Sequence, residues 1–345
     1  EHSISVATAS GVLSAIDRSR YEVIPVGITK AGEFIPFNAD PSSIALDKGL
    51  IELEAKGPSV RFELDGSKEL VELDASGKEV SRRVVDVVFP LLHGPYGEDG
   101  TLQGFLEMAQ LRYVGNGVLA SAAAMDKEFS KALFKAAGIP SPDHVIVYKS
   151  QMLDDPESAL EKIRSLGSFP VFVKPARAGS SVGITKVKAI DGIAAALESA
   201  FEHDDKAIIE VAVSGRELEC GVLDGKDGAP LRVSVAGEIK VSGREFYDFE
   251  AKYVDKDSAS LICPAALSEA ELFEMQQLAK KAFRALGCKG LARVDFFVTE
   301  KGFMLSEINT MPGFTSISMF PRCWEQSGLS YSELIDELIE LALEN

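Results

Sequence analysis

The sequence predicts a three-domain protein in which an N-terminal α/β domain with a parallel sheet precedes two α+β domains. A length of 345 residues suits two to three domains of ordinary size. Within residues 1–120, short apolar segments alternate with helical patterns, which is typical of α/β folds. Beyond residue 120, helices and strands follow in mixed order around a glycine-rich loop. We place the domains at 1–120, 121–215 and 216–345.

The composition indicates a globular protein with an acidic surface. Its 36 Lys and Arg residues against 53 Asp and Glu give a net charge of −17, which repels nucleic acid and anionic lipid. The chain is 46% hydrophobic, but no apolar run approaches the ~20 residues of a membrane-spanning helix. The four cysteines show neither a CxxC motif nor metal-ligand spacing, so we expect a reducing, cytoplasmic environment.

The first 120 residues give two strands, a helix and a β-rich insertion. Segments 21–28 and 84–92 are apolar and short, which predicts strands, and 101–110 has a helical pattern. The polar stretch 30–83 contains strand-like pieces such as 60–64 and turn signals, so we interpret it as a β-rich elaboration.

A helix is predicted to open the second domain. Ser121 is a suitable N-cap, and the apolar residues Met125, Phe129 and Leu133 repeat every four positions. A glycine and a proline then end the helix, and 139–143 is a plausible linker.

The remaining elements follow from local patterns. We expect helices at 156–166 and 191–201, and strands at 171–174, 184–188 and 207–213. Capping boxes at Ser268 with Glu271 and at Ser330 with Glu333 open two helices of the last third. The final helix has one apolar face, predicted to be core, formed by Leu334, Ile335, Leu338, Ile339 and Ala342.

Two short motifs suggest other functions but lack the context that those functions need. Residues 113–120 match a dinucleotide fingerprint, yet the expected acidic residue about 20 positions later falls at a helix end. A tight turn feeding a helix explains the glycines as well. Residues 179–183 match a serine-hydrolase elbow, but they lead into a strand, and His203 is the only histidine that follows.

A hairpin near the C-terminus carries the strongest chemical signal. Segments 293–299 and 303–309 are strand-like and flank a three-residue turn. If Thr299 faces Phe303, then Asp295 lies opposite Glu307 on the face that also carries Arg293 and Asn309.

Opposed carboxylates repel each other unless a positive charge lies between them. Asp295, Glu307 and Asn309 offer only oxygen ligands to a metal, which suits Mg²⁺ rather than zinc. The alternative is an exposed hairpin in which Arg293 neutralises the pair.

A lysine and a glycine-rich loop supply the complementary positive charge. Lys174 ends an apolar strand, and residues 176–183 follow with small, flexible side chains whose N–H groups can wrap an anion. The loop is not a P-loop, and the chain has no kinase motifs. Hairpin, lysine and loop together indicate a nucleoside triphosphate held with Mg²⁺ between two sheets.

Five ordered motifs resemble the ATP-grasp superfamily, and closely its D-alanine–D-alanine ligase family. They are 93–104 (HGPYGEDGTLQG), 118–127 (VLASAAAMDK), 215–217 (GRE), 247–253 (YDFEAKY) and 307–318 (EINTMPGFTSIS). The resemblance implies a three-domain ATP-grasp architecture, with a Rossmann-like N-terminal domain and two α+β domains that sandwich ATP.

The resemblance also implies a role for each matching residue. ATP would be bound by Lys127, Lys174, Ser181, Glu210, Val213, Glu217 and Lys252, with Glu210 at the adenine amino group and Glu217 at the ribose. Asp295, Glu307 and Asn309 would bind Mg²⁺, or Mn²⁺, as two ions. Glu1, His93 and Ser180 would surround the first D-alanine, and Arg293, the Gly313 backbone and Ser318 would hold the second substrate's carboxylate or the developing oxyanion.

The implied reaction is ATP-dependent joining of two D-alanines through a D-alanyl phosphate, for peptidoglycan precursor synthesis. Segment 241–258 is our candidate lid that excludes water. Its Tyr253 favours dipeptide over depsipeptide formation, through a hydrogen bond to Ser180 in a chain that reaches Glu1. The implied catalytic set is therefore Glu1, Ser180, Tyr253, Arg293 and Ser318.

We expect small-molecule partners only, namely D-alanine and ATP, and a homodimer. Three other functions stay open at this point: a related ligase with a different amino or hydroxy acid, an ATP-binding regulatory protein without turnover, and an NAD oxidoreductase.

Overall fold

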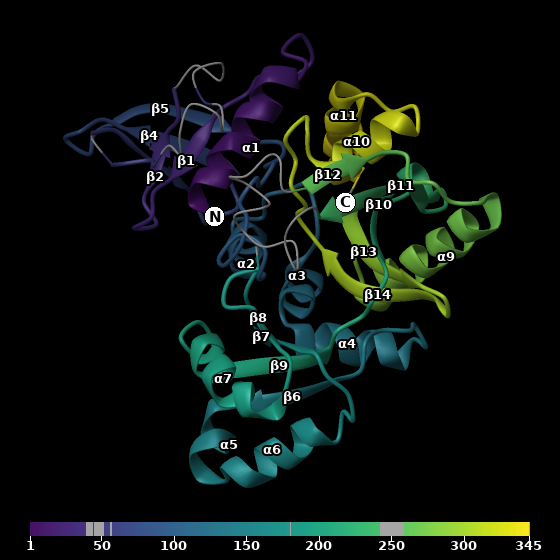
Figure 1. Ribbon diagram of the computed structural model, residues 1–345. Coiled ribbons are helices and arrows are strands. Elements are labelled where there is room, and N and C mark those ends of the chain that lie inside the picture. The colour runs from purple at the N-terminus through teal and green to yellow at the C-terminus, as the bar shows by residue number, and fades with distance from the viewer. Residues whose placement is uncertain (39–43, 45–51, 56, 180, 242–258, 345) are drawn as a thin grey trace.

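The structure is a computed structural model that describes the chain except residues 39–43, 45–51, 56, 180, 242–258 and 345. It has mixed α and β structure, with a small N-terminal β-rich part, a four-stranded sheet and a five-stranded sheet (Figure 1). Within the described residues, no helix is both long and apolar enough to cross a membrane.

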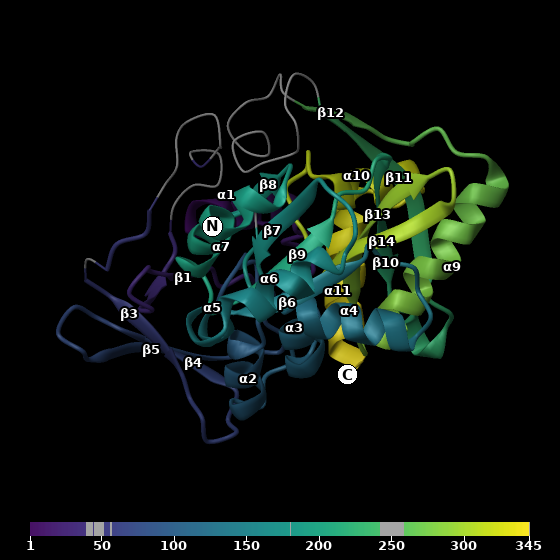
Figure 2. The same ribbon diagram turned by 60° about the horizontal axis from the view of Figure 1, so that its bottom comes forward.

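In residues 1–117, the part that the structure describes forms two small antiparallel sheets and two α-helices. The elements are α1 (His2–Ala15), β1 (Val26–Ile28), β2 (Phe34–Pro36), β3 (Ser59–Phe62), β4 (Glu69–Leu73), β5 (Glu79–Val84) and α2 (Thr101–Met108). Strand β1 pairs with β2, and β3–β4–β5 form a sheet that projects from one edge of the molecule (Figure 2). The β-rich insertion and the helix near 101–110 are therefore confirmed.

The expected parallel sheet differs from what the structure describes. Strand 21–28 is shortened to β1. Of segment 84–92, Val84 ends β5 and Val88 forms an isolated parallel bridge with Tyr113. The apolar side chains of that segment, Val87, Phe89 and Leu91, instead pack on the core around α11. Their hydrophobicity reflects packing in this core, which a pattern of apolar residues does not distinguish from strand pairing.

The middle of the chain is a four-stranded antiparallel sheet with helices on one face. Its elements are β6 (His144–Tyr148), α5 (Lys149–Asp154), α6 (Pro156–Arg164), β7 (Val171–Pro175), β8 (Thr185–Val187), α7 (Ile193–Phe201) and β9 (Lys206–Val211), with strand order β6-β9-β7-β8. Val171, Val173 and Ile209 point to α6 and α7 and are fully buried. Because strand side chains alternate, Lys174 and Glu210 lie on the other face.

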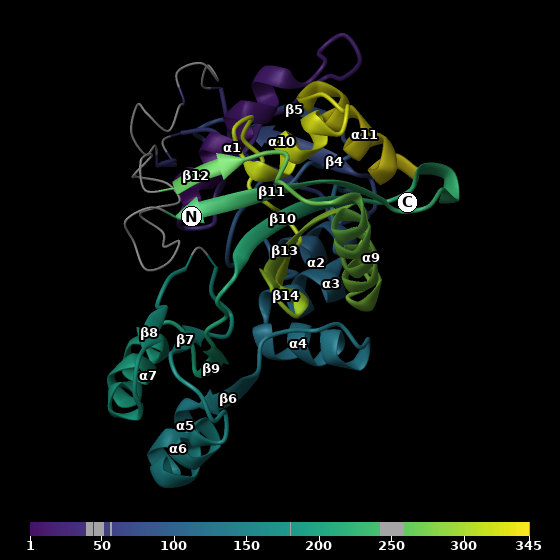
Figure 3. The same ribbon diagram turned by 45° about the vertical axis from the view of Figure 1, so that its right-hand side comes forward.

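The C-terminal part is a five-stranded antiparallel sheet between two helices. Its elements are β10 (Arg216–Leu223), β11 (Arg232–Val241), β12 (Ala259–Ile262), α9 (Glu269–Ala285), β13 (Leu291–Thr299), β14 (Gly302–Asn309), α10 (Met319–Gln326) and α11 (Tyr331–Glu344), with strand order β12-β11-β10-β13-β14. Helix α9 covers the face that carries Cys220, Val294 and Phe296 (Figure 3). On the opposite face, a Cβ at Gly221 would lie 2.4 Å from Trp324 Nε1 of α10, so α10 packs there.

The helix predicted to begin at Ser121 is two helices. Helix α3 (Val118–Met125) ends at Asp126, whose side chain caps α4 (Lys127–Ala136) by accepting from Glu128 N. Phe129 is 58% exposed, and the buried residues of α4 are Ser130, Lys131 and Phe134. The two helices lie between the four-stranded and five-stranded sheets (Figures 1 and 3).

The capping boxes confirm the sequence prediction at two other helices. Ser268 Oγ accepts from Glu271 N, and the Glu271 side chain accepts from Ser268 N at 2.8 Å. Ser330 and Glu333 make the same reciprocal pair before α11. The apolar face of α11 is buried as expected.

Candidate active site

The hairpin β13–β14 aligns the acidic pair as the sequence predicts, although by a different register. Thr299 pairs with Gly302 rather than Phe303, which shifts the turn end of the hairpin by one residue. A β-bulge at Ser306 reverses this shift, so that Asp295 lies opposite Glu307 and Arg293 opposite Asn309. The predicted opposition is confirmed, and the bulge is what produces it.

Arg293 binds two carboxylates on this face. Its guanidinium donates to both oxygens of Asp295, at 2.8 and 2.7 Å, and lies 3.1 Å from Glu219 Oε2. Burial lowers the pKa of Arg293, but Asp295 and Glu219 outweigh that effect and raise it well above its usual value. Asn309 Nδ2 adds a third bond to Asp295, at 2.9 Å.

The donor set on this face fits a hard divalent cation. Asp295, Glu307 and Asn309 present oxygen atoms from two paired strands, and Mg²⁺ prefers such ligands. Asp295 Oδ2 accepts from both Arg293 and Asn309, whereas Oδ1 accepts one bond, from Arg293, and so keeps a lone pair for a cation. Counting only His, Cys, Asp and Glu, the described part of the chain has no cluster of three that is arranged for a metal.

Two lysines place positive charge near this face: Lys174 lies on β7 of the four-stranded sheet, and Lys131 lies on α4. Lys174 Nζ lies 2.6 Å from Glu210 Oε2, and Lys131 Nζ lies 2.5 Å from Glu210 Oε1. Burial raises the pKa of Glu210, but the two lysines outweigh it and bring the value to about 2. Burial lowers the pKa of Lys174, whereas Glu210, then Glu307 and Glu217, raise it by a larger amount. The charge of Glu307 in the five-stranded sheet therefore acts on Lys174 in the other.

Lys127 holds the glycine-rich loop. Its Nζ donates to the carbonyl of Ala178 at 2.8 Å, and its backbone N–H donates to Ala176 at 3.0 Å. Burial lowers the pKa of Lys127, and Glu307 opposes this effect. The lysine thus lies between the loop and the acidic pair.

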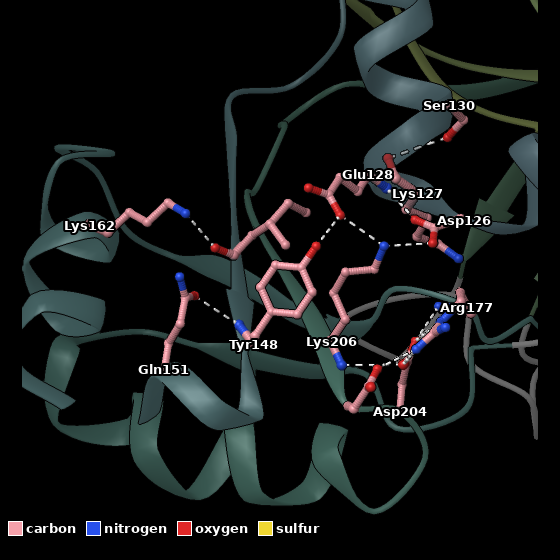
Figure 4. A network of polar contacts seen from close by, with 12 residues as sticks. Asp126, Lys127, Glu128, Ser130, Tyr148, Gln151, Lys162, Arg177, Asp204 and Lys206 are labelled. Carbon is pink, nitrogen blue, oxygen red and sulfur yellow. Dashed lines mark hydrogen bonds and ion pairs between the residues drawn. The ribbon is translucent and has the colours of Figure 1, made fainter. Parts of the chain in front are cut away.

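A buried ionic network fixes the start of α4 and so the position of Lys127 (Figure 4). Lys206 Nζ lies 2.6 Å from Asp126 Oδ2 and 2.8 Å from Glu128 Oε2, and Tyr148 OH donates to Glu128. Lys206 and Asp126 are 4% and 7% exposed, so the pair is largely desolvated. Since buried paired charges fix geometry, the network ties α4 to β9 and β6.

The start of α1 meets the glycine-rich loop and the loop at 93–100. A Cβ at Gly179 would lie 3.0 Å from the Glu1 carboxylate, and one at Gly94 would overlap it. His93 Nε2 bonds Thr8 Oγ1 at 2.9 Å. Burial lowers the pKa of His93 to about 4, so the imidazole is neutral at physiological pH.

Gly313 and Ser318 form a turn at the start of α10. Ser318 Oγ accepts from Thr315 N at 3.2 Å and lies 2.7 Å from Thr315 Oγ1, and a Cβ at Gly313 would lie 3.2 Å from Ser318 Oγ. The serine hydroxyl therefore closes its own turn in this structure.

The other candidate residues divide into described and undescribed positions. Glu217 lies on β10 two residues before Glu219, so the two side chains share a face. Val213 follows the end of β9. Ser181 has a left-handed backbone with φ +60°. Ser180 of the glycine-rich loop lies outside the described residues, as do Lys252, Tyr253 and all of the candidate lid except residue 241.

Sequence reasoning missed three residues of this site. Glu219 pairs directly with Asp295, and its place two residues after Glu217 on a strand was the available signal. Glu98 accepts from Gly94 N at 2.5 Å. Lys131 has the pattern of an ordinary helical lysine and gives no signal of its burial.

The raised pKa of Glu98 predicts how the free energy of unfolding changes with pH. Burial, with a smaller addition from the charge of Glu1, raises its pKa to about 8, although the Gly94 N–H opposes this. An unfolded glutamate ionises near ~4.3. Between that pH and about pH 8, Glu98 is ionised in the unfolded chain but protonated in the folded one. The contribution of Glu98 to the free energy of unfolding therefore falls as the pH rises, by at most ~1.4 kcal/mol per pH unit. Above about pH 8 this contribution is constant.

Glu98→Gln removes this loss. In urea unfolding experiments we compare the free energy of unfolding of the variant with that of the wild type at each pH. The difference in favour of the variant is expected to be larger at about pH 8.5 than at about pH 5. Glu202→Gln, at an exposed position, is the matched control. A variant whose stability difference from wild type is the same at both pH values contradicts the raised pKa.

The two antiparallel sheets, with lysines on one and an acidic pair on the other, define the ATP-grasp class of fold. The model of the D-ala D-ala ligase N-terminus matches residues 1–116, and that of the D-ala D-ala ligase C-terminus matches 133–340. The D-alanine–D-alanine ligase of Arthrobacter sp. (strain FB24) is 51% identical over 352 residues, covering 99% of this chain and 91% of the relative. The ligase of Mycobacterium avium (strain 104) is 48% identical, covering 99% and 93%.

Solved structures agree with these relatives. The VanG D-Ala:D-Ser ligase from Enterococcus faecalis superposes with a TM-score of 0.84 at 36% identity, covering 99% of this chain and 95% of that one. The D-alanine-D-alanine ligase from Coxiella burnetii gives 0.80 at 33% identity, covering 99% and 90%. The chain belongs to the D-alanine–D-alanine ligase family.

Proposed function

We infer that this protein joins two D-alanine molecules to D-alanyl-D-alanine with conversion of ATP to ADP, for peptidoglycan precursor synthesis. Membership of the family over the full chain supports this activity. The observation that carries it in the structure is the alignment of Asp295 with Glu307, within the electrostatic reach of Lys127 and Lys174. A nucleotide bound between the sheets meets charges of both signs there.

ATP is the co-substrate that the family implies. We assign its phosphates to Lys127, Lys174 and the glycine-rich loop with Ser181, its adenine amino group to Glu210, and its ribose to Glu217. The backbone at Val213 would line the base, and Lys252 of the candidate lid is a further ATP-binding residue. Mg²⁺ or Mn²⁺, as two ions, would be held by Asp295, Glu307 and Asn309 and would neutralise phosphate charge.

The chemistry needs charge stabilisation and alignment rather than an enzyme nucleophile. A carboxylate is a poor electrophile, so the first D-alanine takes the γ-phosphoryl group of ATP and becomes an acyl phosphate. The amine of the second D-alanine then attacks the acyl carbon, and phosphate leaves. Correct alignment of two substrates can contribute ~7 to 11 kcal/mol in favourable cases.

The residues near the glycine-rich loop suit the first substrate. Glu1 carries the charge to bind an ammonium group, and neutral His93 can donate or accept without adding charge. Ser180 would complete this set. Arg293, the Gly313 backbone and Ser318 would hold the second carboxylate or the oxyanion. For Ser318, this role requires its hydroxyl to leave Thr315.

Water has to be excluded, because it hydrolyses acyl phosphates. We assign this task to segment 241–258, with Tyr253 directed to Ser180. We further propose domains at 1–120, 121–215 and 216–345, a homodimer, and a cytoplasmic location.

The direct test is phosphate release from ATP. We expect release with D-alanine and Mg²⁺, and little with L-alanine, with D-lactate, or without a divalent cation. D-Serine as second substrate is an informative arm, because a structural relative is a D-Ala:D-Ser ligase. Release with another amino acid but not with D-alanine contradicts the proposal.

Tyr253→Phe tests the choice of dipeptide over depsipeptide. Loss of the hydroxyl removes the proposed bond to Ser180, so we expect the variant to gain D-lactate incorporation at neutral pH. The measurement is product analysis with D-alanine and D-lactate in competition, with Tyr247→Phe as control. A variant that gains no use of D-lactate contradicts the assignment.

A further inference from the structure

Lys131 is a buried lysine that contacts both sheets. It is 2% exposed in the middle of α4, a depth at which a lysine needs a partner for its charge. Its Nζ lies 2.5 Å from Glu210 Oε1 and donates to the carbonyl of Ser306 at 3.2 Å. Glu210 belongs to β9 and Ser306 to β14, so one ammonium group joins the two sheets.

The Glu210 carboxylate is shared by two lysines of different exposure. Oε1 faces Lys131, whose side chain is 3% exposed, and Oε2 faces Lys174, whose side chain is 17% exposed. Lys174 lies one residue before the end of β7, where the glycine-rich loop begins, so it is the lysine able to turn to an anionic ligand. When Lys174 turns away, Glu210 remains in the interior, and Lys131 stays beside it as counter-ion.

The second contact of Lys131 falls on the bulge that aligns the acidic pair. Ser306 is the extra residue between Leu305, which pairs with Phe296, and Glu307, which pairs with Asp295. A one-residue slip in a strand turns its side chains to the other face. By bonding the Ser306 carbonyl, Lys131 stabilises the backbone that presents Glu307.

We propose that Lys131 is a positioning residue that keeps Glu210 ionised and directed at the adenine amino group, and that it thereby sets the preference for ATP over GTP. An ionised carboxylate only accepts hydrogen bonds. Adenine offers an amino donor at that position, whereas guanine offers a carbonyl oxygen, which the carboxylate repels. The inference rests on the proposed function, because it requires ATP in this site.

Removal of Lys131 leaves Lys174 as the partner of Glu210 among the contacts described here. Glu210 then takes up a proton more readily and becomes a donor to guanine, which lowers the preference for ATP over GTP. Glu210 also holds Lys174 away from phosphate, which raises KM for both nucleotides. Neither effect involves the D-alanine residues. A purely structural role would lower all kinetic parameters together.

The experiment compares Lys131→Met with Lys135→Met, at an exposed position of the same helix. We expect Lys131→Met to raise KM for ATP about tenfold, and to reduce the ratio of kcat/KM for ATP over GTP by about tenfold, the scale of a lost buried charge contact. KM for D-alanine and all parameters of Lys135→Met should stay within about twofold. An unchanged ATP:GTP ratio, or equal losses for ATP and D-alanine, overturns the proposal.

A double-mutant cycle with Glu210→Gln tests whether Lys131 acts through Glu210. The effect of Lys131→Met on the ATP:GTP ratio should disappear in the Glu210→Gln background, and an equal effect in both backgrounds overturns the proposal. If Lys131→Met does not fold, Lys131→Arg keeps the charge and should retain the ATP preference. A folded Lys131→Arg that loses the ATP preference counts against the proposal.

The proposed function and the role of Lys131 are contradicted by different results. A wild-type protein without D-alanine-dependent phosphate release contradicts the proposed function. A wild-type protein that is active, with a Lys131→Met variant that still discriminates ATP from GTP, contradicts only the role of Lys131. Binding of ADP measured by calorimetry, without D-alanine, gives a readout that does not depend on turnover.

Discussion

Arg293→Met is expected to lower both stability and turnover, and to lower stability far more than Glu307→Gln does. Asp295 and Glu219 have side chains only 14% and 8% exposed, and both lie within 3.1 Å of the guanidinium. Removing one partner of a buried ion pair costs ~3 to 5 kcal/mol, because the other charge stays desolvated. Loss of a donor at a developing negative charge lowers kcat by ~10² to 10³-fold.

The measurements are urea unfolding and ATP-dependent phosphate release at a temperature where the variant is folded. Arg293→Lys separates charge from geometry, because lysine restores the charge without the planar fork. We expect it to recover most of the stability and little of the turnover. Arg284→Met, at an exposed position of α9, is the matched control. An Arg293→Met variant with nearly wild-type turnover contradicts the assigned role.

The acidic pair was predictable from the sequence because strand alternation is a strong constraint. The prediction placed Asp295 opposite Glu307 from a turn of the wrong length, and the bulge at Ser306 compensated for the error. Bulges leave little trace in a sequence, since the extra residue here is an ordinary serine. The residues on the face were therefore accessible to pattern reasoning, whereas the backbone feature that aligns them was not.

Helix α4 shows a different limit of sequence reasoning. The apolar repeat through Phe129 and Leu133 predicts a helix, yet these side chains are exposed and Lys131 is buried. The Nζ of Lys206 lies 4.9 Å from the ring centroid of Phe129, so the ring makes a cation–π contact instead of packing in the core. The burial of Lys131 depends on Glu210 from a distant strand, and such long-range pairs are not encoded in local periodicity.

The apolar face of α11 was easier to anticipate. It buries a continuous apolar surface, and the hydrophobic effect makes such surfaces the most regular signal in a sequence. The N-terminal part was harder, because apolar residues of segment 84–92 pack in the core around α11, whereas its parallel pairing is limited to Val88 and Tyr113. The family of this part follows from the match of the D-ala D-ala ligase N-terminus model to residues 1–116, whereas the apolar pattern alone suggests a parallel sheet.

Glu307→Gln is expected to separate activity from stability. Glutamine keeps the size of the side chain and its carbonyl oxygen but removes the negative charge that acts on Lys127 and Lys174. A cation held by Asp295, Glu307 and Asn309 loses one charged ligand, so we expect a higher Mg²⁺ requirement and kcat lowered by ~10² to 10³-fold. Unfolding should change far less than in Arg293→Met, because Arg293 still neutralises Asp295.

The readout is phosphate release over a range of Mg²⁺ concentrations, with urea unfolding measured in parallel. Glu300→Gln, at the exposed turn of the same hairpin, controls for general loss of surface charge. Two outcomes count against the site: an unchanged Mg²⁺ dependence, or a loss of stability as large as the loss in Arg293→Met. The second outcome would mean that Glu307 serves the hairpin itself, because a residue kept for cation binding contributes little to folding in the absence of the cation.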